Sequence, residues 1–118
     1  MTDSTSSLML QEAMSAGDCV ALQLSQDVER YAELGRTLRS TPFNSAVTVA
    51  RGSSDHASGY VAYLIMSRMG RLVTSLPMSL VTLYKSPLVT RDTLAISISQ
   101  SGQSPDVVEP IRYFRDGG

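Results

Sequence analysis

The sequence predicts an α/β fold in which short parallel strands alternate with helices in layers. Three short apolar segments rich in β-branched residues occur along the chain, and a segment with helical features follows each of them. Crossovers of this kind are right-handed and leave consecutive strands parallel. The first and third apolar segments also run into serine-rich loops, and ligands of open α/β sheets bind beyond the carboxyl ends of the strands.

The N-terminal third of the chain is expected to be helical. Residues 1–7 are small and polar, and we expect them to be disordered. Apolar residues then recur with the 3.6-residue period, interrupted at Gly17-Asp18. We therefore predict two helices, over residues 8–16 and 19–39, with Asp18 as the N-cap of the second. Pro42 disfavours a helical residue before it and ends that helix.

The first strand and its helix follow directly. The segment "AVTVA" (46–50) is short and apolar, as expected of a strand that is buried on both faces. Gly52 permits a tight turn, and Ser53 or Ser54 can cap the next helix. Gly70 is suited to end that helix as a C-cap.

Two further strand–helix pairs are predicted. The segment "RLVTSL" (71–76) reads as the second strand, and a short helix begins at Pro77 and extends to about Tyr84. The third strand covers residues 93–99. The last helix has Ser104 as its N-cap, Pro105 at its first position and Asp106 in its first turn. Pro110 removes one backbone hydrogen bond inside it.

The 118 residues suffice for one domain, which we divide into a helical segment (1–40) and an α/β part (41–118). Three parallel strands form a thin sheet with open edges, which proteins normally avoid. The sequence ends where a fourth strand would begin. We therefore expect the chain to be the first part of a longer protein.

Composition excludes several function classes. The formal net charge is -1 and the ten cationic residues are scattered, so nucleic-acid binding is not expected. Cys19 and His56 are the only residues of their types, which argues against a disulfide within the chain and a zinc site. The N-terminus lacks the features of a signal peptide, and no apolar run is long enough to span a membrane. We expect a cytoplasmic protein without a cofactor or metal.

The two polar loops, "RGSSDH" and "SQSGQS", are the candidate site. Each leads into a helix N-terminus, whose free N–H groups suit an anion. Gly102 lets the backbone approach closely, and hydroxyls donate to phosphate oxygens without bulk. Six serines lie in or beside the loops: Ser53, Ser54, Ser97, Ser99, Ser101 and Ser104. The alternative is that they form turns and caps. Capping suits Ser104, and Ser97 can be buried and bonded to backbone.

Other motifs give weaker hypotheses. Neither dinucleotide nor P-loop glycine patterns occur, and Ser54-Asp55-His56 does not make a triad, because adjacent helical residues diverge by about 100°. His56 is expected to line or support the site rather than act as a base. Arg51 can add charge for a phosphate, or it can pair with Asp55 or Asp92.

The two loops also carry a resemblance. "ARGSSDHASGYVAYLI" with "SISQSGQSPD" resembles the SIS (sugar isomerase) domain family, in particular the isomerase half of glutamine:fructose-6-phosphate aminotransferases and the SIS-type glucosamine-6-phosphate deaminases. The similarity runs from about Val47 to the end. It implies a flavodoxin-like, three-layer αβα sandwich with five parallel strands, of which this chain carries the first three. It also implies two such domains in the complete protein, and a homodimer.

The resemblance further implies which residues bind a hexose 6-phosphate or an amino-sugar 6-phosphate. Ser53 and Ser54, beside Gly52, line the sugar-phosphate site, while the second loop grips the phosphate through Ser99, Gln100, Ser101 and Ser104, with Gly102 among them. The family's acid–base and ring-opening groups lie mostly beyond residue 118, so the catalytic residues stay unassigned. The sequence around Lys85 does not match the family's Schiff-base lysine.

The resemblance leaves the reaction open. Family aminotransferases begin with a glutaminase domain and a cysteine after the initiator Met, whereas Thr2 stands there in this sequence. That favours a deaminase or isomerase that uses free ammonia. The short N-terminal segment also leaves no room for the helix-turn-helix of family regulators. The alternatives are a non-catalytic sugar-phosphate sensor and, less favoured, a nucleotide-binding domain. The chain alone is expected to bind weakly and to be inactive.

Overall fold

The computed structural model describes residues 7–118, and the chain divides into two compact units between Thr41 and Pro42. Each unit is described by itself. The expectation of disorder for residues 1–6 lies outside the described residues. Ser7 was included in that expectation, but it is the N-cap of the first helix and its hydroxyl accepts a bond from the Leu10 N–H. No helix in residues 7–118 is both long and apolar enough to cross a membrane.

The first unit holds two helices, α1 (Leu8–Gln26) and α2 (Val28–Ser40). The predicted break at Gly17-Asp18 was wrong, because both residues lie inside α1. A glycine inside a helix costs only about 1 kcal/mol, which the continuous hydrogen bonding of a 19-residue helix tolerates. The helical geometry is interrupted instead at Asp27, whose φ is -105° and ψ is 9°.

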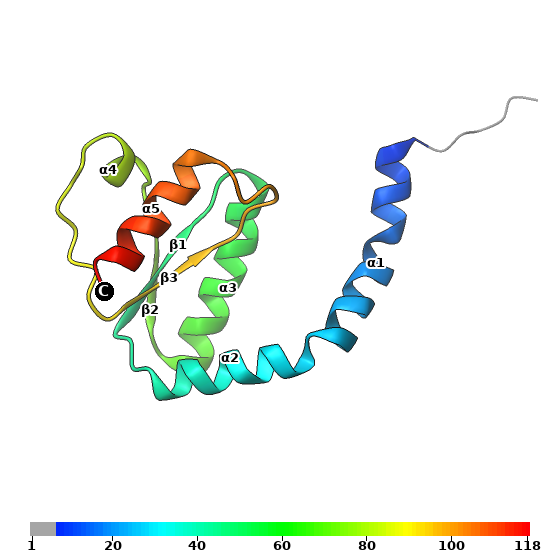
Figure 1. The fold of residues 1–118 in the computed structure, drawn as a ribbon, viewed down its shortest axis with the longest axis horizontal. Helices are drawn as coiled ribbons and strands as arrows, with labels where there is room; N and C mark the ends of the chain where they lie inside the picture. The colour runs from blue at the N-terminus through cyan, green and yellow to red at the C-terminus, as the bar shows by residue number, and fades with distance from the viewer. Residues whose placement is uncertain (1–6) are drawn as a thin grey trace, which may run out of the picture. The chain divides into compact units, whose positions relative to one another are not determined.

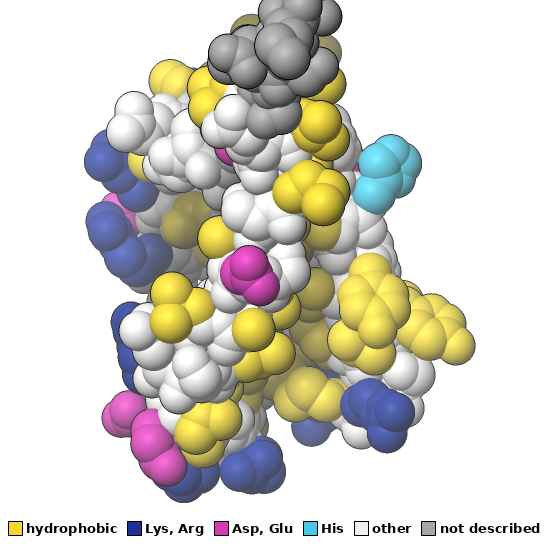
Figure 2. Space-filling view, turned by 90° about the vertical axis from the view of Figure 1, so that its right-hand side faces the viewer, with side chains coloured by type: hydrophobic (Ala, Val, Ile, Leu, Met, Phe, Trp, Pro, Cys, Tyr) yellow, Lys and Arg dark blue, Asp and Glu magenta, His cyan; other side chains and the backbone are white. Residues whose placement is uncertain are grey.

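Neither α1 nor α2 contains a buried residue. The large apolar side chains of these helices are exposed, and they include Met9, Leu10, Met14, Val20, Leu24, Val28 and Leu34. Figure 2 shows hydrophobic side chains at the surface on one face of the protein. The apolar periodicity of the sequence therefore correctly predicted helices here, but the apolar side chains of this unit do not form a buried face.

The second unit is built on a three-stranded parallel sheet in the order β2-β1-β3 (Figure 1). Strand β1 (Ser45–Val49) lies in the middle, β2 (Leu72–Ser75) on one side and β3 (Thr93–Ser97) on the other. All three strands occur where the sequence predicted them, with ends that differ by one or two residues. The predicted α/β class with a parallel sheet is confirmed.

Helices cover both faces of this sheet. Helix α3 (Ser53–Met69) packs against β1 and β2, while α5 (Pro105–Asp116) packs against β3 and β1 together with the short α4 (Ser79–Thr82) (Figure 1). The chain adds β2 on one side of β1 and β3 on the other side. Because both crossovers are right-handed, α3 and α5 lie on opposite faces of the sheet. Gly70 ends α3 in the left-handed conformation, as predicted. Pro77 does not begin α4, which starts two residues later.

The core lies between the sheet and α5. Its buried members are Val49, Leu76, Val81, Val107 and Phe114. Because side chains alternate along a strand, Ala46 and Thr48 of β1 point to the opposite face, toward α3, and both are buried. Ser58 of α3 is also fully buried and donates to the Ser54 carbonyl. The fully buried residues of α3 and of this face of β1 are therefore small, whereas large apolar residues fill the α5 side.

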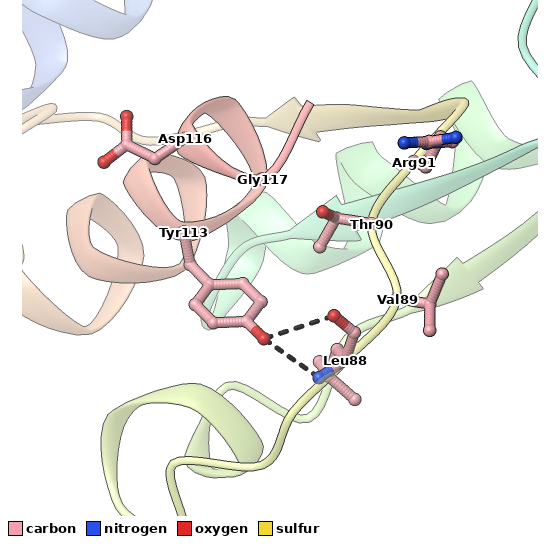
Figure 3. Close-up of a pocket in the computed structure, with 7 residues that line it drawn as sticks. All are labelled: Leu88, Val89, Thr90, Arg91, Tyr113, Asp116 and Gly117. Carbon is pink, nitrogen blue, oxygen red and sulfur yellow. Dashed lines mark hydrogen bonds between the residues drawn. The ribbon is translucent and has the colours of Figure 1, made fainter.

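A pocket of about 510 Å³ lies beside the start of β3 and the C-terminal end of α5 (Figure 3). The Tyr113 ring points toward the segment before β3, and its hydroxyl accepts a hydrogen bond from the Leu88 N–H at 2.9 Å. The same hydroxyl lies within donating distance of the carbonyls of Leu88 (3.2 Å) and Ser86 (3.3 Å). Tyr113 thus anchors the irregular segment between α4 and β3 to α5.

We predict that Tyr113→Phe lowers the free energy of unfolding by about 1 kcal/mol, because it removes a part-buried hydroxyl that bonds to backbone. Urea-induced unfolding followed by circular dichroism measures the change. Tyr60→Phe is the matched control, since Tyr60 is 65% exposed on α3. Equal stabilities of the two variants would contradict the anchoring role.

Candidate functional site

The candidate site begins where β1 and β3 end. These strands are neighbours, and Val49 is paired with Ser97 in the register. Both strands are parallel, so the loops that follow them leave the sheet at the same edge and side by side. The loop after β1 leads into α3, and the loop after β3 leads into α5. The two serine-rich segments are thereby brought together, although more than forty residues separate them along the chain.

The two loops enclose a pocket of about 490 Å³. It is lined by Arg51, Gly52, Ser53, Ser54, Ile98, Ser99, Gln100, Ser101, Ser104 and Val107. Of the eight site residues named from the sequence, seven line this pocket. The eighth, Gly102, lines an adjoining pocket of about 430 Å³ that also contains Ser99. The structure therefore brings seven of the eight predicted residues together around one pocket.

Two helices begin at this pocket without a side-chain cap. The N-cap of α3 is Gly52, and Ser53 and Ser54 are the first helical residues, so the expectation that one of these serines caps the helix was wrong. Ser104 is the N-cap of α5, as predicted, but its hydroxyl makes no capping bond. The first N–H groups of a helix have no partner inside it and carry partial positive charge. The N-terminus of α3 can therefore donate to an anion through the N–H groups of Ser53 and Ser54. At α5, Pro105 has no N–H and the Val107 N–H bonds to the Ser104 carbonyl, so the donor left in the first turn is the Asp106 N–H.

The serines of the second loop already bond to its backbone. Ser99 accepts a hydrogen bond from the Gly102 N–H at 3.0 Å, and Ser101 accepts one from the Gln103 N–H at 3.3 Å. A hydroxyl that accepts still has its own hydrogen to donate. The turn-forming and ligand-binding interpretations of these serines are therefore compatible.

Ser97 is used differently. Its hydroxyl donates to the Val49 carbonyl at 3.0 Å, which joins the ends of β3 and β1. The predicted bond to backbone is confirmed, but the residue is exposed rather than buried. Ser97 is not among the residues that line the pocket between the two loops.

Glycine conformation shapes both loops. Gly52 has φ 59° and ψ -134°, a region that residues with a Cβ essentially avoid. Gly102 has φ 65°. No atom lies within 4 Å of the position that a Cβ would take at either residue. Both glycines are therefore required for the backbone conformation rather than for space.

The charged groups at the site differ from expectation. Arg51 lines the pocket and forms an ion pair with Asp106 of α5, not with Asp55 or Asp92 as the sequence suggested. His56 is exposed and is not among the lining residues.

Sequence reasoning also missed Ile98 and Val107 as lining residues. They continue the apolar pattern of β3 and α5, so nothing in the sequence alone separated them from the core. Within residues 7–118, no group of His, Cys, Asp and Glu side chains is arranged to hold a metal ion.

Comparisons with known proteins give a consistent result. The chain is 32% identical over 93 residues to the glutamine–fructose-6-phosphate aminotransferase (isomerizing) of Thermus thermophilus, a match that covers 79% of this chain and 15% of that protein. It is 29% identical over 107 residues to the enzyme of the same name from Methanocaldococcus jannaschii, covering 91% of this chain and 9% of that one. No protein-family model matches the chain.

A solved structure is similar as well. The chain superposes with a TM-score of 0.83 and 33% identity on a "putative phosphosugar isomerase" from Silicibacter pomeroyi DSS-3. The match covers 88% of this chain and 32% of that one. The chain thus spans about a third of the solved structure and a much smaller part of the curated relatives.

We predict that Gly52→Ala lowers the free energy of unfolding by about 1–3 kcal/mol, the usual range for a residue held in a sparsely populated backbone region. Gly59→Ala is the control, because Gly59 lies within α3 and also has no atom near the position of a Cβ. That substitution should raise stability by about 0.5–1 kcal/mol. Chemical unfolding of both variants measures the difference, and a neutral or stabilising Gly52→Ala would refute the argument.

Proposed function

Because this chain belongs to the SIS (sugar isomerase) domain family, we propose that the pocket between its two serine loops binds the phosphate of a hexose 6-phosphate or an amino-sugar 6-phosphate. The observation that carries the proposal is the convergence of two uncapped helix N-termini on one serine-lined pocket. Helix N-termini are suited to phosphate because unpaired N–H groups and the helix dipole act together.

The side chains around the pocket fit this ligand. Ser53 and Ser54 approach from one loop, and Ser99, Gln100, Ser101 and Ser104 from the other. Hydroxyls and amides donate to phosphate oxygens. Ile98 and Val107 add apolar surface, which suits a pocket that excludes part of the water around a ligand.

Acid–base catalysis is not expected from this pocket alone. Among the described residues that line it, none is Asp, Glu, His or Lys. Moving a proton between adjacent sugar carbons needs such a group within hydrogen-bond reach of the substrate. We therefore propose that these loops recognise the phosphate and that the chemistry is performed by groups outside this pocket.

The proposed complete function is that of an amino-sugar-phosphate deaminase/isomerase, which interconverts sugar phosphates of the glucosamine and fructose type. The curated relatives are isomerizing aminotransferases, which supports the isomerase class. A sugar-phosphate sensor would use the same pocket without catalysis. The homodimer stays a prediction that follows from the resemblance, and the cytoplasmic location stays a prediction that follows from the sequence composition and the N-terminus.

We predict that Ser99→Ala combined with Ser101→Ala weakens the affinity for fructose 6-phosphate about tenfold or more. Each lost hydrogen bond to a charged group removes roughly 1.5–3 kcal/mol. Isothermal titration calorimetry with the full chain measures the dissociation constant. Non-phosphorylated fructose should not bind, because the proposed site recognises the phosphate.

Ser67→Ala is the matched control for this experiment. It removes an exposed serine hydroxyl of α3 that bonds to the Leu64 carbonyl and lies outside the pocket lining. Its affinity should equal that of the wild type. Unchanged affinity in the Ser99/Ser101 double variant would rule out the assigned site.

A thermal-shift comparison tests whether the pocket prefers sugar phosphates or nucleotides. Glucosamine 6-phosphate should raise the melting temperature of the chain, since a ligand that binds only the folded state stabilises it. ATP at the same concentration should produce a smaller shift. A larger shift with ATP than with glucosamine 6-phosphate, measured by differential scanning fluorimetry, would favour a nucleotide-binding domain.

A further inference from the structure

An ion pair between Arg51 and Asp106 joins the loop after β1 to the first turn of α5 at the candidate site. Arg51 follows the buried end of β1, and Asp106 stands in the first turn of α5. The two residues are 55 positions apart in the sequence. Their side chains are 61% and 49% exposed, so the pair lies at the mouth of the pocket rather than in the core.

The carboxylate of Asp106 and a bound phosphate would both be stabilised by the positively charged N-terminus of α5, so they would compete for it. The partial positive charge at the N-terminus of α5 stabilises the carboxylate of Asp106, the only acidic side chain in its first turn. It would equally stabilise a phosphate that accepts from the Asp106 N–H, the donor left in the first turn because Pro105 has no N–H and the Val107 N–H bonds to the Ser104 carbonyl. Two anions at one helix end repel each other, which opposes ligand binding.

Arg51 is placed to remove this conflict. Arg51 lines the pocket and Asp106 does not, so Arg51 is the pocket-side residue of the pair. A guanidinium stays protonated at any physiological pH and offers several donors. Paired with Asp106, it cancels the carboxylate charge and leaves the helix dipole available to a second anion.

We propose that Arg51 is a positioning residue whose function is to neutralise Asp106, so that the N-terminus of α5 can accept the phosphate of a sugar phosphate. The inference rests on the proposed function of the pocket and adds which residue neutralises the negative charge beside it. It differs from two other roles for Arg51. In one, Arg51 is a direct phosphate ligand, and in the other the ion pair only holds the two loops together.

A double-mutant cycle separates the three roles. We expect Arg51→Gln to weaken fructose 6-phosphate binding about five- to tenfold, because Asp106 is left uncompensated beside the phosphate. Asp106→Asn should bind as tightly as the wild type or a few-fold more tightly. The double variant Arg51→Gln/Asp106→Asn should return to within about twofold of the wild type. Arg51→Lys keeps the charge and should retain most of the affinity.

Each contrary result overturns the proposal in a recognisable way. A double variant as weak as Arg51→Gln would show that Arg51 contacts the phosphate directly. Weak binding by Asp106→Asn would show that the pair acts as a structural link. Unchanged binding by Arg51→Gln would show that Asp106 has no influence on the ligand. Fructose 6-phosphate is used because its sugar carries no charge that could itself pair with Asp106.

Salt provides a readout that a purely structural role would not change in the same way. The ratio of affinities between wild type and Arg51→Gln should shrink between about 50 mM and about 500 mM NaCl, since exposed charges are screened over a few ångströms at high salt. A ratio that is independent of salt would contradict the electrostatic role.

The exposed ion pair Lys85–Glu109 is the matched control. Its side chains are 66% and 47% exposed, and it joins the segment after α4 to α5 outside the pocket lining. Neither Lys85→Gln nor Glu109→Gln should change the affinity. Urea unfolding of all variants tests that each is folded. Failure of the wild type to bind any sugar phosphate would overturn the proposed function itself, whereas binding without the Arg51 effects overturns only this inference.

Discussion

The parallel pairing of β1 with β3 is the constraint on which the candidate site depends. Its register sets Val49 opposite Ser97, and the Ser97 hydroxyl fastens the two strand ends by bonding to the Val49 carbonyl. A shift of the register by one residue would turn every side chain of β3 to the other face. It would remove Ala95 from the core beside Val49 and would also separate the two loops. Core packing and site geometry are therefore stabilised by the same alignment.

The two loops that follow these strands are short, and few interactions within them set their conformation. Each is only a few residues long and is set by a glycine with positive φ, Gly52 in one and Gly102 in the other. Ser99 and Ser101 then bond to the backbone of the second loop. Short loops bonded in this way lose little further conformational entropy when a ligand binds. The proposed site would thus be largely formed before a ligand binds.

Much of this arrangement was predictable from the sequence because local signals agreed with the tertiary fold. Strand positions followed from short β-branched runs, and the start of α5 followed from Ser104 and Pro105. The failures arose where one local signal was weak. Gly17 and Asp18 suggested a helix break, but a single glycine costs too little to end a helix. Ser53 or Ser54 was expected to cap α3, but Gly52, with its positive φ, is the N-cap.

The partner of Arg51 could not be found from the sequence for a different reason. Asp55 is close to Arg51 in the sequence, whereas Asp92 precedes β3 at the end of the sheet opposite to Arg51. Pairing is decided by the approach of α5 to the loop after β1, a tertiary contact across 55 residues. This contact matters because the chain has a net charge of -1 and cannot attract a phosphate by bulk charge. Under the proposed function, recognition would come from oriented N–H groups and hydroxyls. Such local dipoles act only over short distances, so one uncompensated carboxylate beside them would offset much of their effect. An acidic residue in the first turn of α5 is therefore compatible with anion binding only where a cation is held against it.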